Sequence, residues 1–206
     1  PCGSKKSNQT PRRPRGRPRT LDRQRTIEIA TECYWQEGPH ALGVNELCRR
    51  AGISKPGLYR EFGGEDGLMR AALDHYRRTV LERLHQLLAS ERPFGDVLQG
   101  LVSWYTSDRD LPAGCLFSKL RASPDQLGPD TTARVAALRE ELQGAYEAWY
   151  IRAVARGDAN SDVDPPLAAY TLDTQLTTVT MLMAAGEPPD RVRAQASLAL
   201  ASLMAP

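Results

Sequence analysis

The sequence predicts an all-α protein, with an N-terminal three-helix helix-turn-helix domain followed by a larger helical domain. Apolar residues recur at helical spacing, for example at Ile27, Ala30 and Tyr34, as in helices that bury one face. No segment alternates apolar and polar residues over the length of a strand. Gly and Pro stand between the periodic segments, where helices are expected to end.

Charge is unevenly distributed along the chain. The 206 residues are 41% hydrophobic and 25% charged, which is enough apolar material for a packed core. Residues 1–78 carry 16 Lys and Arg against 9 Asp and Glu, a balance of +7, whereas residues 79–206 carry 11 against 16, a balance of −5. A basic first part and an acidic second part indicate that only the first binds a polyanion.

The cysteines and the hydropathy pattern restrict the class of protein. Cys2, Cys33, Cys48 and Cys115 are far apart and form no C-x-x-C pair. We therefore expect no disulfide scaffold, metal site or cofactor, and a reduced, cytoplasmic setting. No run approaches the ~20 apolar residues of a membrane span, and the N-terminus lacks the apolar centre of a signal peptide, so no membrane partner is expected.

Residues 1–20 are expected to form a disordered basic arm, because they are rich in Arg and Pro and nearly free of apolar residues. Arg15, Arg17 and Arg19 lie in an extended Arg-Gly-Arg-Pro-Arg run that suits the narrow minor groove of A·T-rich DNA. A solubilising tail is the alternative. The arm leads directly into the first helix, and this position favours the minor-groove role.

The first helix is predicted between Leu21 and Gly38. Asp22 is a suitable N-cap, and Gly38-Pro39 ends the helix. Arg23 and Arg25 in its first turn are expected near a phosphate backbone.

A helix-turn-helix is predicted within residues 42–68. The first of its helices runs from Asn45 to Ala51, with Asn45 as its cap. Gly52 then supplies the left-handed residue that ends it. Ser54 caps a second helix, Lys55 to Phe62, whose first turn accommodates Pro56.

The second of these helices has one buried and one open face. Leu58 and Phe62, four residues apart, share the buried face. The remaining face is basic and aromatic, and a helix of this kind suits the major groove of DNA. It consists of Lys55, Gly57, Tyr59, Arg60 and Glu61.

The stretch GISKPGLYREFGGEDGL resembles the recognition helix of TetR-type transcriptional regulators, in which a pattern close to G-[IV]-S-[KR]-x-x-L-Y-x-x-F is usual. The resemblance is strongest between Leu21 and Tyr76. It implies an all-α regulator that binds double-stranded operator DNA, with Tyr59 and Asn45 at phosphates. The full set of implied DNA-binding residues is Arg15, Arg17, Arg19, Asn45, Ser54, Lys55, Pro56, Gly57, Tyr59 and Arg60.

The sequence departs from this family at one position. Members often carry a Lys that holds phosphate where this chain has Glu65. A carboxylate suits a helix N-terminus but repels phosphate, so the arginine arm is expected to compensate.

The remaining helices are predicted from their apolar spacing and from Gly and Pro breaks. We expect domain boundaries that give a DNA-binding domain at 21–68 and a ligand-binding and dimerisation domain at 69–206. The predicted helices are Glu65 to Leu88, Phe94 to Thr106, Gly114 to Arg121, Asp130 to Arg156, Pro166 to Ala185 and Pro189 to Met204.

The last two helices carry few charges on one side, and the resemblance implies a homodimer interface there. A two-fold dimer can read a palindromic operator with both recognition helices. Packing within one chain is the alternative for these apolar residues, which are Leu172, Leu176, Val179, Leu182, Met183, Val192, Leu198 and Leu203.

A small-molecule effector is expected to bind among the middle helices, because aromatic side chains with a few polar groups are typical of ligand cavities. Ordinary core packing is the alternative for each of them. Cys115 also raises the hypothesis of an electrophile or redox sensor. The predicted ligand-binding residues are Trp104, Tyr105, Cys115, Phe117, Tyr146, Trp149 and Tyr150.

The sequence thus predicts a DNA-binding transcriptional regulator, a repressor that its ligand releases from the operator. An enzyme with a merely structural helix-turn-helix and an architectural DNA binder driven by the arm are the alternatives. No catalytic residues are predicted, because His40, His75 and His85 have no partners at catalytic spacing and no phosphate-binding loop is present.

Overall fold

The computed structural model describes residues 22–39, 41–107, 112 and 114–205. Within these residues the prediction of an all-α fold is confirmed, since an isolated bridge between Ala159 and Met204 is the only β interaction described. The predictions for residues 1–20, including Arg15, Arg17 and Arg19, lie outside the described residues. No helix in the described part of the chain combines the length and apolar character needed to cross a bilayer.

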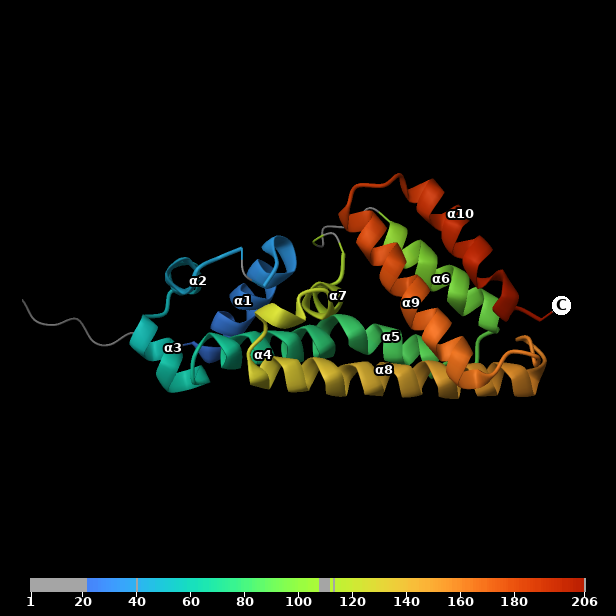
Figure 1. The fold of residues 1–206 in the computed structure, drawn as a ribbon, viewed down its shortest axis with the longest axis horizontal. Helices are drawn as coiled ribbons and strands as arrows, with labels where there is room; N and C mark the ends of the chain where they lie inside the picture. Colours follow the sequence, from blue (N-terminus) through green and yellow to red (C-terminus); the bar gives the residue numbers. More distant parts are fainter. Residues whose placement is uncertain (1–21, 40, 108–111, 113, 206) are drawn as a thin grey trace, which may run out of the picture.

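Helices α1 (Arg23–Glu37), α2 (Val44–Ala51) and α3 (Lys55–Phe62) form a three-helix unit at one end of an elongated molecule (Figure 1). The predicted N-cap of the first helix is confirmed, because the Asp22 carboxylate accepts a hydrogen bond of 3.0 Å from the Arg25 amide. The unit is held together by fully buried apolar side chains from all three helices, among them Tyr34, Leu47 and Leu58. This small core fixes α3 at the end of the molecule.

The long helix predicted from Glu65 to Leu88 is continuous but not uniform. It consists of α4 (Glu65–Tyr76), a π-helical turn η1 (Arg77–Leu81) and α5 (Glu82–Leu88). A π turn holds more residues than an α turn, so it changes which side chains face the neighbouring helix. The following helix α6 (Phe94–Thr106) has the predicted bounds and begins after Pro93.

The C-terminal elements agree with the prediction to within a few residues at their ends. They are α7 (Leu116–Arg121), η2 (Pro124–Gln126), α8 (Pro129–Arg156), α9 (Pro165–Ala184), α10 (Pro189–Leu200) and η3 (Ala201–Leu203). Helices α8, α9 and α10 each begin at a proline, which tolerates the first helical position because no intrahelical partner is needed there.

The segment α4–η1–α5 lies beside α8 and runs parallel to it (Figure 1). The Asp66 carboxylate accepts hydrogen bonds from the amides of Asp130, at 2.9 Å, and Thr131, at 3.0 Å. Farther along, Arg77 Nε donates to Glu141 at 3.0 Å, and Arg152 donates to the carbonyl oxygen of Leu88 at 2.6 Å. Three of these contacts, 66 to 130, 77 to 141 and 88 to 152, have the same offset of 64 residues. The two helices are therefore locked in a fixed register.

The inner faces of α9 and α10 pack within the chain. Most of the apolar residues predicted to form a dimer face are buried in this core, as the alternative proposed, and these are Leu172, Leu176, Val179, Val192 and Leu203. Leu182 and Met183 are partly buried against this core, and Leu198 is 80% exposed. The apolar residues that remain exposed on α9 lie on its other side and are Leu167, Tyr170 and Met181.

Candidate nucleic-acid interface

The turn between α2 and α3 has the geometry that the sequence predicts. Gly52 adopts the left-handed conformation, with φ 66° and ψ 26°, which glycine reaches at little steric cost. Ser54 caps α3, because its hydroxyl oxygen accepts a hydrogen bond of 3.2 Å from the Gly57 amide. Pro56 occupies the first turn of α3. Local stereochemistry therefore sets the angle at which α3 leaves the turn.

The prediction that Asn45 caps α2 is wrong. The helix begins one residue earlier, at Val44, and its N-cap is Gly43, which has an extended backbone. Asn45 lies inside the first turn and is exposed. No side chain caps this helix start, so its first N–H groups are open to an anion, for which helix N-termini are suited.

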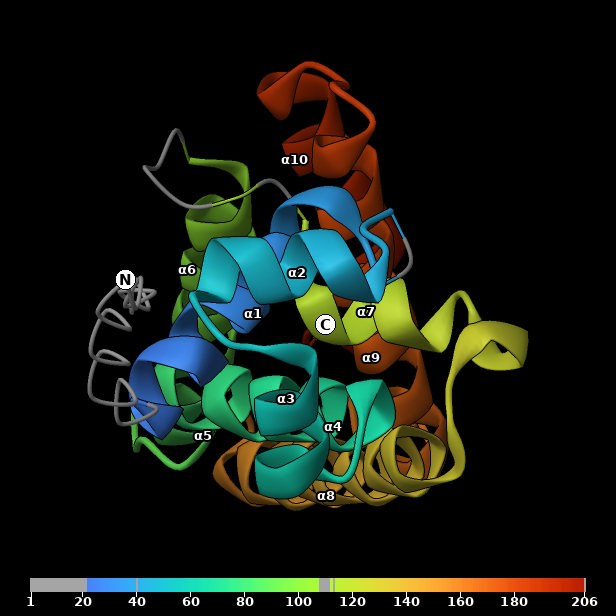
Figure 2. The ribbon, with the colours of Figure 1, turned by 90° about the vertical axis from the view of Figure 1, so that its left-hand side faces the viewer.

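Helix α3 lies at the end of the molecule that faces the viewer in Figure 2. Lys55 and Pro56 are exposed, Tyr59 is 53% exposed, and the Arg60 side chain is 70% exposed. Arg60 reaches solvent while it pairs with the neighbouring Glu61 at 3.1 Å. These side chains are free to meet a partner without any change in the core.

The expectation that Gly57 belongs to the open face is wrong. Gly57 is buried, and a Cβ atom at this position would stand 3.1 Å from Ser54 Oγ and 3.3 Å from Ile53 Cγ1. The residue matters for close packing of α3 on the turn. Beside it, a hollow of about 380 Å³ is lined by α1 and α3 residues that include Arg25 and Arg60.

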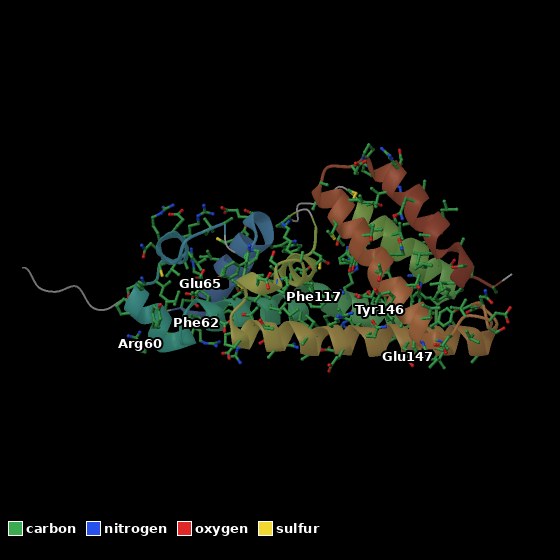
Figure 3. The ribbon with its side chains drawn as sticks, viewed as in Figure 1. Arg60, Phe62, Glu65, Phe117, Tyr146 and Glu147 are labelled. Atoms are coloured by element: carbon green, nitrogen blue, oxygen red, sulfur yellow. The ribbon has the colours of Figure 1, made fainter. Side chains whose placement is uncertain are left out.

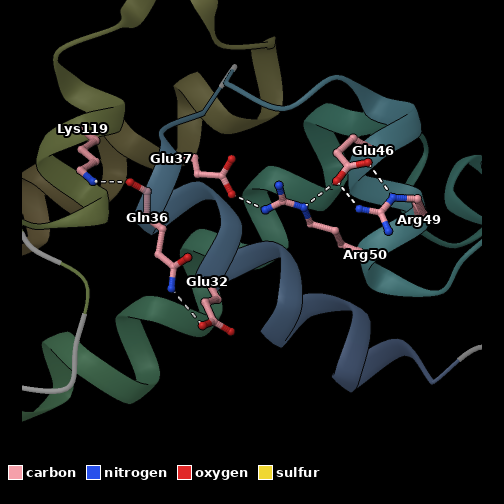
Figure 4. A network of polar contacts seen from close by, with 7 residues as sticks. All are labelled: Glu32, Gln36, Glu37, Glu46, Arg49, Arg50 and Lys119. Atoms are coloured by element: carbon pink, nitrogen blue, oxygen red, sulfur yellow. Dashed lines mark hydrogen bonds and ion pairs between the residues drawn. The ribbon is translucent and has the colours of Figure 1, made fainter.

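A network of ion pairs joins α2 to the end of α1 (Figure 4). Glu46 accepts hydrogen bonds from Arg49 at 2.6 Å and from Arg50 at 2.8 Å, and Arg50 also pairs with Glu37. The hydrogen bonds from Arg49 and Arg50 lower the pKa of Glu46 to about 2. The carboxylate is therefore ionised at neutral pH, and it holds both arginines on the surface of α2.

The same end of α1 is held by α7 and the loop before it. Trp35 Nε1 donates a hydrogen bond of 3.1 Å to the carbonyl oxygen of Gly114, and Lys119 Nζ donates to the carbonyl oxygen of Trp35. Burial lowers the pKa of Lys119. These contacts connect the C-terminal helices directly to the three-helix unit.

The residues predicted to bind an effector fall into two groups. In the first, Cys115, Phe117 and Tyr146 are buried, and Phe117 and Tyr146 lie in the middle part of the molecule (Figure 3). The hydroxyl of Tyr76 on α4 donates to Cys115 Sγ at 3.2 Å. Burial raises the pKa of Tyr146, and the nearby Tyr105 and Asp173 add to this effect.

The second group packs elsewhere. The Phe94 ring lies 4.5 Å from Trp149 and 5.6 Å from Tyr150, measured between ring centroids, so these two aromatics belong to a core cluster. The Trp104 ring lies tilted against Tyr105 with a centroid distance of 4.8 Å, and Tyr105 itself lies near Tyr146 of the first group. The structure therefore does not bring the seven predicted residues into one place.

Two surface hollows near the C-terminal helices are lined by other residues. One of about 790 Å³ lies between α7, α8 and α9 and includes Arg139 and Tyr170, and one of about 890 Å³ lies between α6 and α10. None of the seven predicted ligand-binding residues lines either of them. The sequence does not predict these hollows, because a hollow depends on which helices meet, and the periodicity of one helix does not contain that information.

Comparison with known proteins gives matches in both parts of the chain. Residues 27–72 match the family described as bacterial regulatory proteins, tetR family. Residues 94–198, about half of the chain, match the family described as tetracyclin repressor-like, C-terminal domain.

Among curated proteins, the chain is 34% identical to the HTH-type transcriptional repressor ComR of Escherichia coli K12 over 116 residues, which cover 54% of this chain and 55% of ComR. It is 34% identical to the HTH-type transcriptional repressor BdcR of the same organism over 95 residues, 46% of each chain. The chain thus spans about half the length of the curated relatives it matches.

Solved structures match over nearly the whole length. A cysteine mutant of the TetR family transcriptional regulator CifR, complexed with 26bp double-strand operator DNA, is 26% identical with a TM-score of 0.73, covering 91% of this chain and 100% of that chain. Reduced NemR of Escherichia coli has the same TM-score at 17% identity, covering 89% of this chain and 97% of that chain, and so shows a likeness of fold.

Proposed function

This chain belongs to the TetR family of bacterial regulatory proteins, and on that premise we propose that it is a transcriptional regulator that binds double-stranded operator DNA as a homodimer. One observation carries the proposal. Lys55, Tyr59 and Arg60 are exposed on α3, and α3 lies at the end of the molecule that faces the viewer in Figure 2. CifR, a relative of the same fold, is complexed with operator DNA.

In the proposed complex, α3 enters the major groove and its arginine reads a base edge. Arg60 presents the planar, two-pronged donor set that recognises guanine, and Lys55 and Tyr59 contact bases or phosphates beside it. The open N-terminus of α2 binds phosphate. The basic arm of residues 1–20 adds affinity from the minor groove.

The dimer is proposed to form through α9 and α10. Leu167, Tyr170 and Met181 on α9 and Leu198 on α10 are all more than half exposed, and large exposed apolar side chains on neighbouring helices are typical of an interface. Two α3 helices related by a two-fold axis would read the two halves of a palindromic operator.

We propose further that residues 69–206 bind a small-molecule effector that releases the protein from DNA, so that the protein is a repressor. This requires the effector to bind the conformation that does not bind DNA more tightly. The group formed by Cys115, Phe117 and Tyr146 is the favoured site, because Tyr76 on α4 contacts it and α4 follows directly on the helix-turn-helix. The protein would act in the cytoplasm, where bacterial operators lie, and we propose no enzymatic activity.

A redox-responsive or electrophile-responsive regulator is the second candidate. It is favoured by the position of Cys115 directly before α7 and in contact with Tyr76, because a group added to the sulfur there would push on α4. The burial of Cys115, which is 7% exposed, opposes fast reaction. If an alkylating agent releases both wild type and the Cys115→Ser variant from the operator, this candidate is excluded.

Fluorescence anisotropy with salt titration tests the main proposal. DNA from the region upstream of the protein's own gene is compared with scrambled DNA, for wild type and for Arg60→Ala. We expect wild type to prefer the specific DNA and the variant to lose most of this preference, about 1–3 kcal/mol for one bidentate base contact. Equal binding to both DNAs with a steep salt dependence would favour an architectural DNA binder instead. Absence of binding to either DNA at low salt would contradict the proposal.

A further inference from the structure

The cation of Arg23 is held against an aromatic ring at the end of the recognition helix. Its guanidinium carbon lies 5.2 Å from the centroid of the Phe62 ring. Arg23 is the first residue of α1 and is exposed, and Phe62 is the last residue of α3 and is half-buried. The ring and the cation therefore belong to different helices, and their contact fixes the position of a positive charge that would otherwise move freely on a long side chain.

The surroundings of this charge have two notable features. No acidic partner of Arg23 is found in the described part of the chain. The next helix begins at Glu65, close to Phe62 in the structure (Figure 3), and no side chain caps it. Asp66, the other acid of this first turn, is directed to the start of α8 by its hydrogen bonds to Asp130 and Thr131.

The length of α3 is close to the width of the major groove of DNA. Eight residues make a helix of about 12 Å, and the major groove is about 12 Å wide. If a helix of this length lies across the groove, its two ends approach the two sugar-phosphate walls. At the N-terminal end of α3, Lys55 is available to the wall. At the C-terminal end, Arg23 is the cation that the structure holds in place.

We propose that Arg23, supported by the Phe62 ring, binds a DNA phosphate at the C-terminal end of α3. This inference rests on the proposed function, and it assigns to Arg23 a phosphate contact that compensates for Glu65. Because guanidinium and phosphate match in shape and charge, the contact would position α3 without reading a base. A purely structural role, in which the cation only stabilises the C-terminus of α3, is the alternative that the experiment must exclude.

The test measures how affinity depends on salt for the full chain, on the upstream DNA and on scrambled DNA. One lost phosphate contact reduces the slope of log K against log salt by about 0.9. Between 50 and 200 mM salt, Arg23→Ala should therefore lose about 3.5-fold less affinity than wild type does. The loss should be equal on both DNAs, so that the preference for the specific DNA stays unchanged. Arg23→Lys, which keeps the charge, should retain the wild-type slope.

Arg83→Ala is a matched control. Arg83 lies on α5, and its guanidinium carbon stands 5.4 Å from the centroid of the Trp104 ring, so the substitution removes the same kind of contact and the same charge elsewhere. Its slope should equal that of wild type, and an equal change in both variants would mean that net charge alone is responsible and would overturn the proposal. A thermal melt of each variant confirms folding.

The outcomes separate this inference from the proposed function. If wild type distinguishes the two DNAs, Arg60→Ala loses that distinction and Arg23→Ala keeps the wild-type slope, only the role of Arg23 fails. If Arg23→Ala has the wild-type salt slope but a lower melting temperature, Arg23 has a structural role and does not bind phosphate. If wild type binds neither DNA, the proposed function fails and the inference fails with it.

Discussion

Replacing Asp66 by Ala should destabilise the protein, because this carboxylate on α4 caps a different helix. It accepts hydrogen bonds of 2.9 and 3.0 Å from the first-turn amides of α8, and the Thr131 hydroxyl donates in return to the carbonyl oxygen of Asp66 at 3.1 Å. Helix α8 has 28 residues and no cap from its own neighbours, since Gly128 precedes it. Its N-terminal N–H groups therefore depend on Asp66.

The size of the effect follows from known capping energies. Removing an N-cap side chain costs about 0.5–2 kcal/mol, and hydrogen bonds to a charged group contribute about 1.5–3 kcal/mol each when well buried. Because the site is partly open to solvent, we expect a loss of about 1–2 kcal/mol. For a chain of this size, that lowers the melting temperature by roughly 2–8 °C.

Thermal and urea unfolding, followed by circular dichroism at equal protein concentrations, measure this loss. Asp125→Ala is the control, because Asp125 is an exposed acid in η2, just before α8, and its loss should leave the melting temperature unchanged. Gly128→Ala provides an independent check, since its methyl group would stand 2.7 Å from Asp66 Cβ and should destabilise the same joint. An Asp66→Ala variant as stable as wild type would refute the cap.

The effect should also depend on pH. Burial by itself raises the pKa of Asp66, but the hydrogen bonds from Thr131 and Asp130 outweigh it and hold the pKa below its ordinary value of 3.8. A carboxyl group with a lowered folded-state pKa adds stability above its unfolded-state pKa and loses it as the pH falls through the folded-state pKa. The difference in stability between wild type and Asp66→Ala should therefore be complete above about pH 4 and shrink in stronger acid.

Three further predictions concern other parts of the molecule. Ser54→Ala should lower stability by about 1 kcal/mol through loss of the α3 cap, which thermal unfolding checks; an unchanged melting temperature would contradict the cap. Leu198→Glu should convert the proposed dimer to a monomer without loss of fold, because Leu198 is 80% exposed in one chain. Light scattering after gel filtration would show an unchanged dimer mass if α10 is not in the interface. Glu141→Gln should lower the free energy of unfolding by about 1 kcal/mol at neutral pH, at the upper end for a partly exposed pair. The loss should be small in acid, because the Arg77 hydrogen bond lowers the pKa of Glu141 and its contribution disappears as the carboxylate is protonated. A loss that does not change with pH in urea unfolding would exclude the ion pair as its cause.

Local stereochemistry made much of the fold predictable. A helix end favours a left-handed glycine, and a helix start favours a capping hydroxyl. Gly52 has the predicted left-handed conformation, and Ser54 makes the predicted cap. The prediction for Asn45 failed because a glycine can precede a helix without offering a side-chain cap, so the helix began one residue earlier. The π turn at Arg77–Leu81 was not predicted, because the apolar spacing of residues 65–88 indicates a helix without distinguishing α from π turns.

Site residues were predictable where the pattern of a single helix decides which side chains are exposed. The open face of α3 follows from its apolar spacing, whereas the effector residues depend on contacts between helices. Trp149 has the spacing of a residue on a buried face and packs against Phe94, and the sequence of α8 alone cannot tell that partner from a ligand. The contact between Arg23 and Phe62 likewise joins residues 39 positions apart on two helices, and only the folded structure reveals it.

The cap that Asp66 places on α8 has a consequence for engineering chimeric regulators. The boundary predicted after residue 68 lies within α4, so a DNA-reading module cut there would carry Asp66 into a foreign protein without the amides of Asp130 and Thr131. The smallest portable unit is therefore discontinuous in sequence, and an exchange that retains the N-terminal half of α8 with the helix-turn-helix should yield better-folded hybrids than a single crossover.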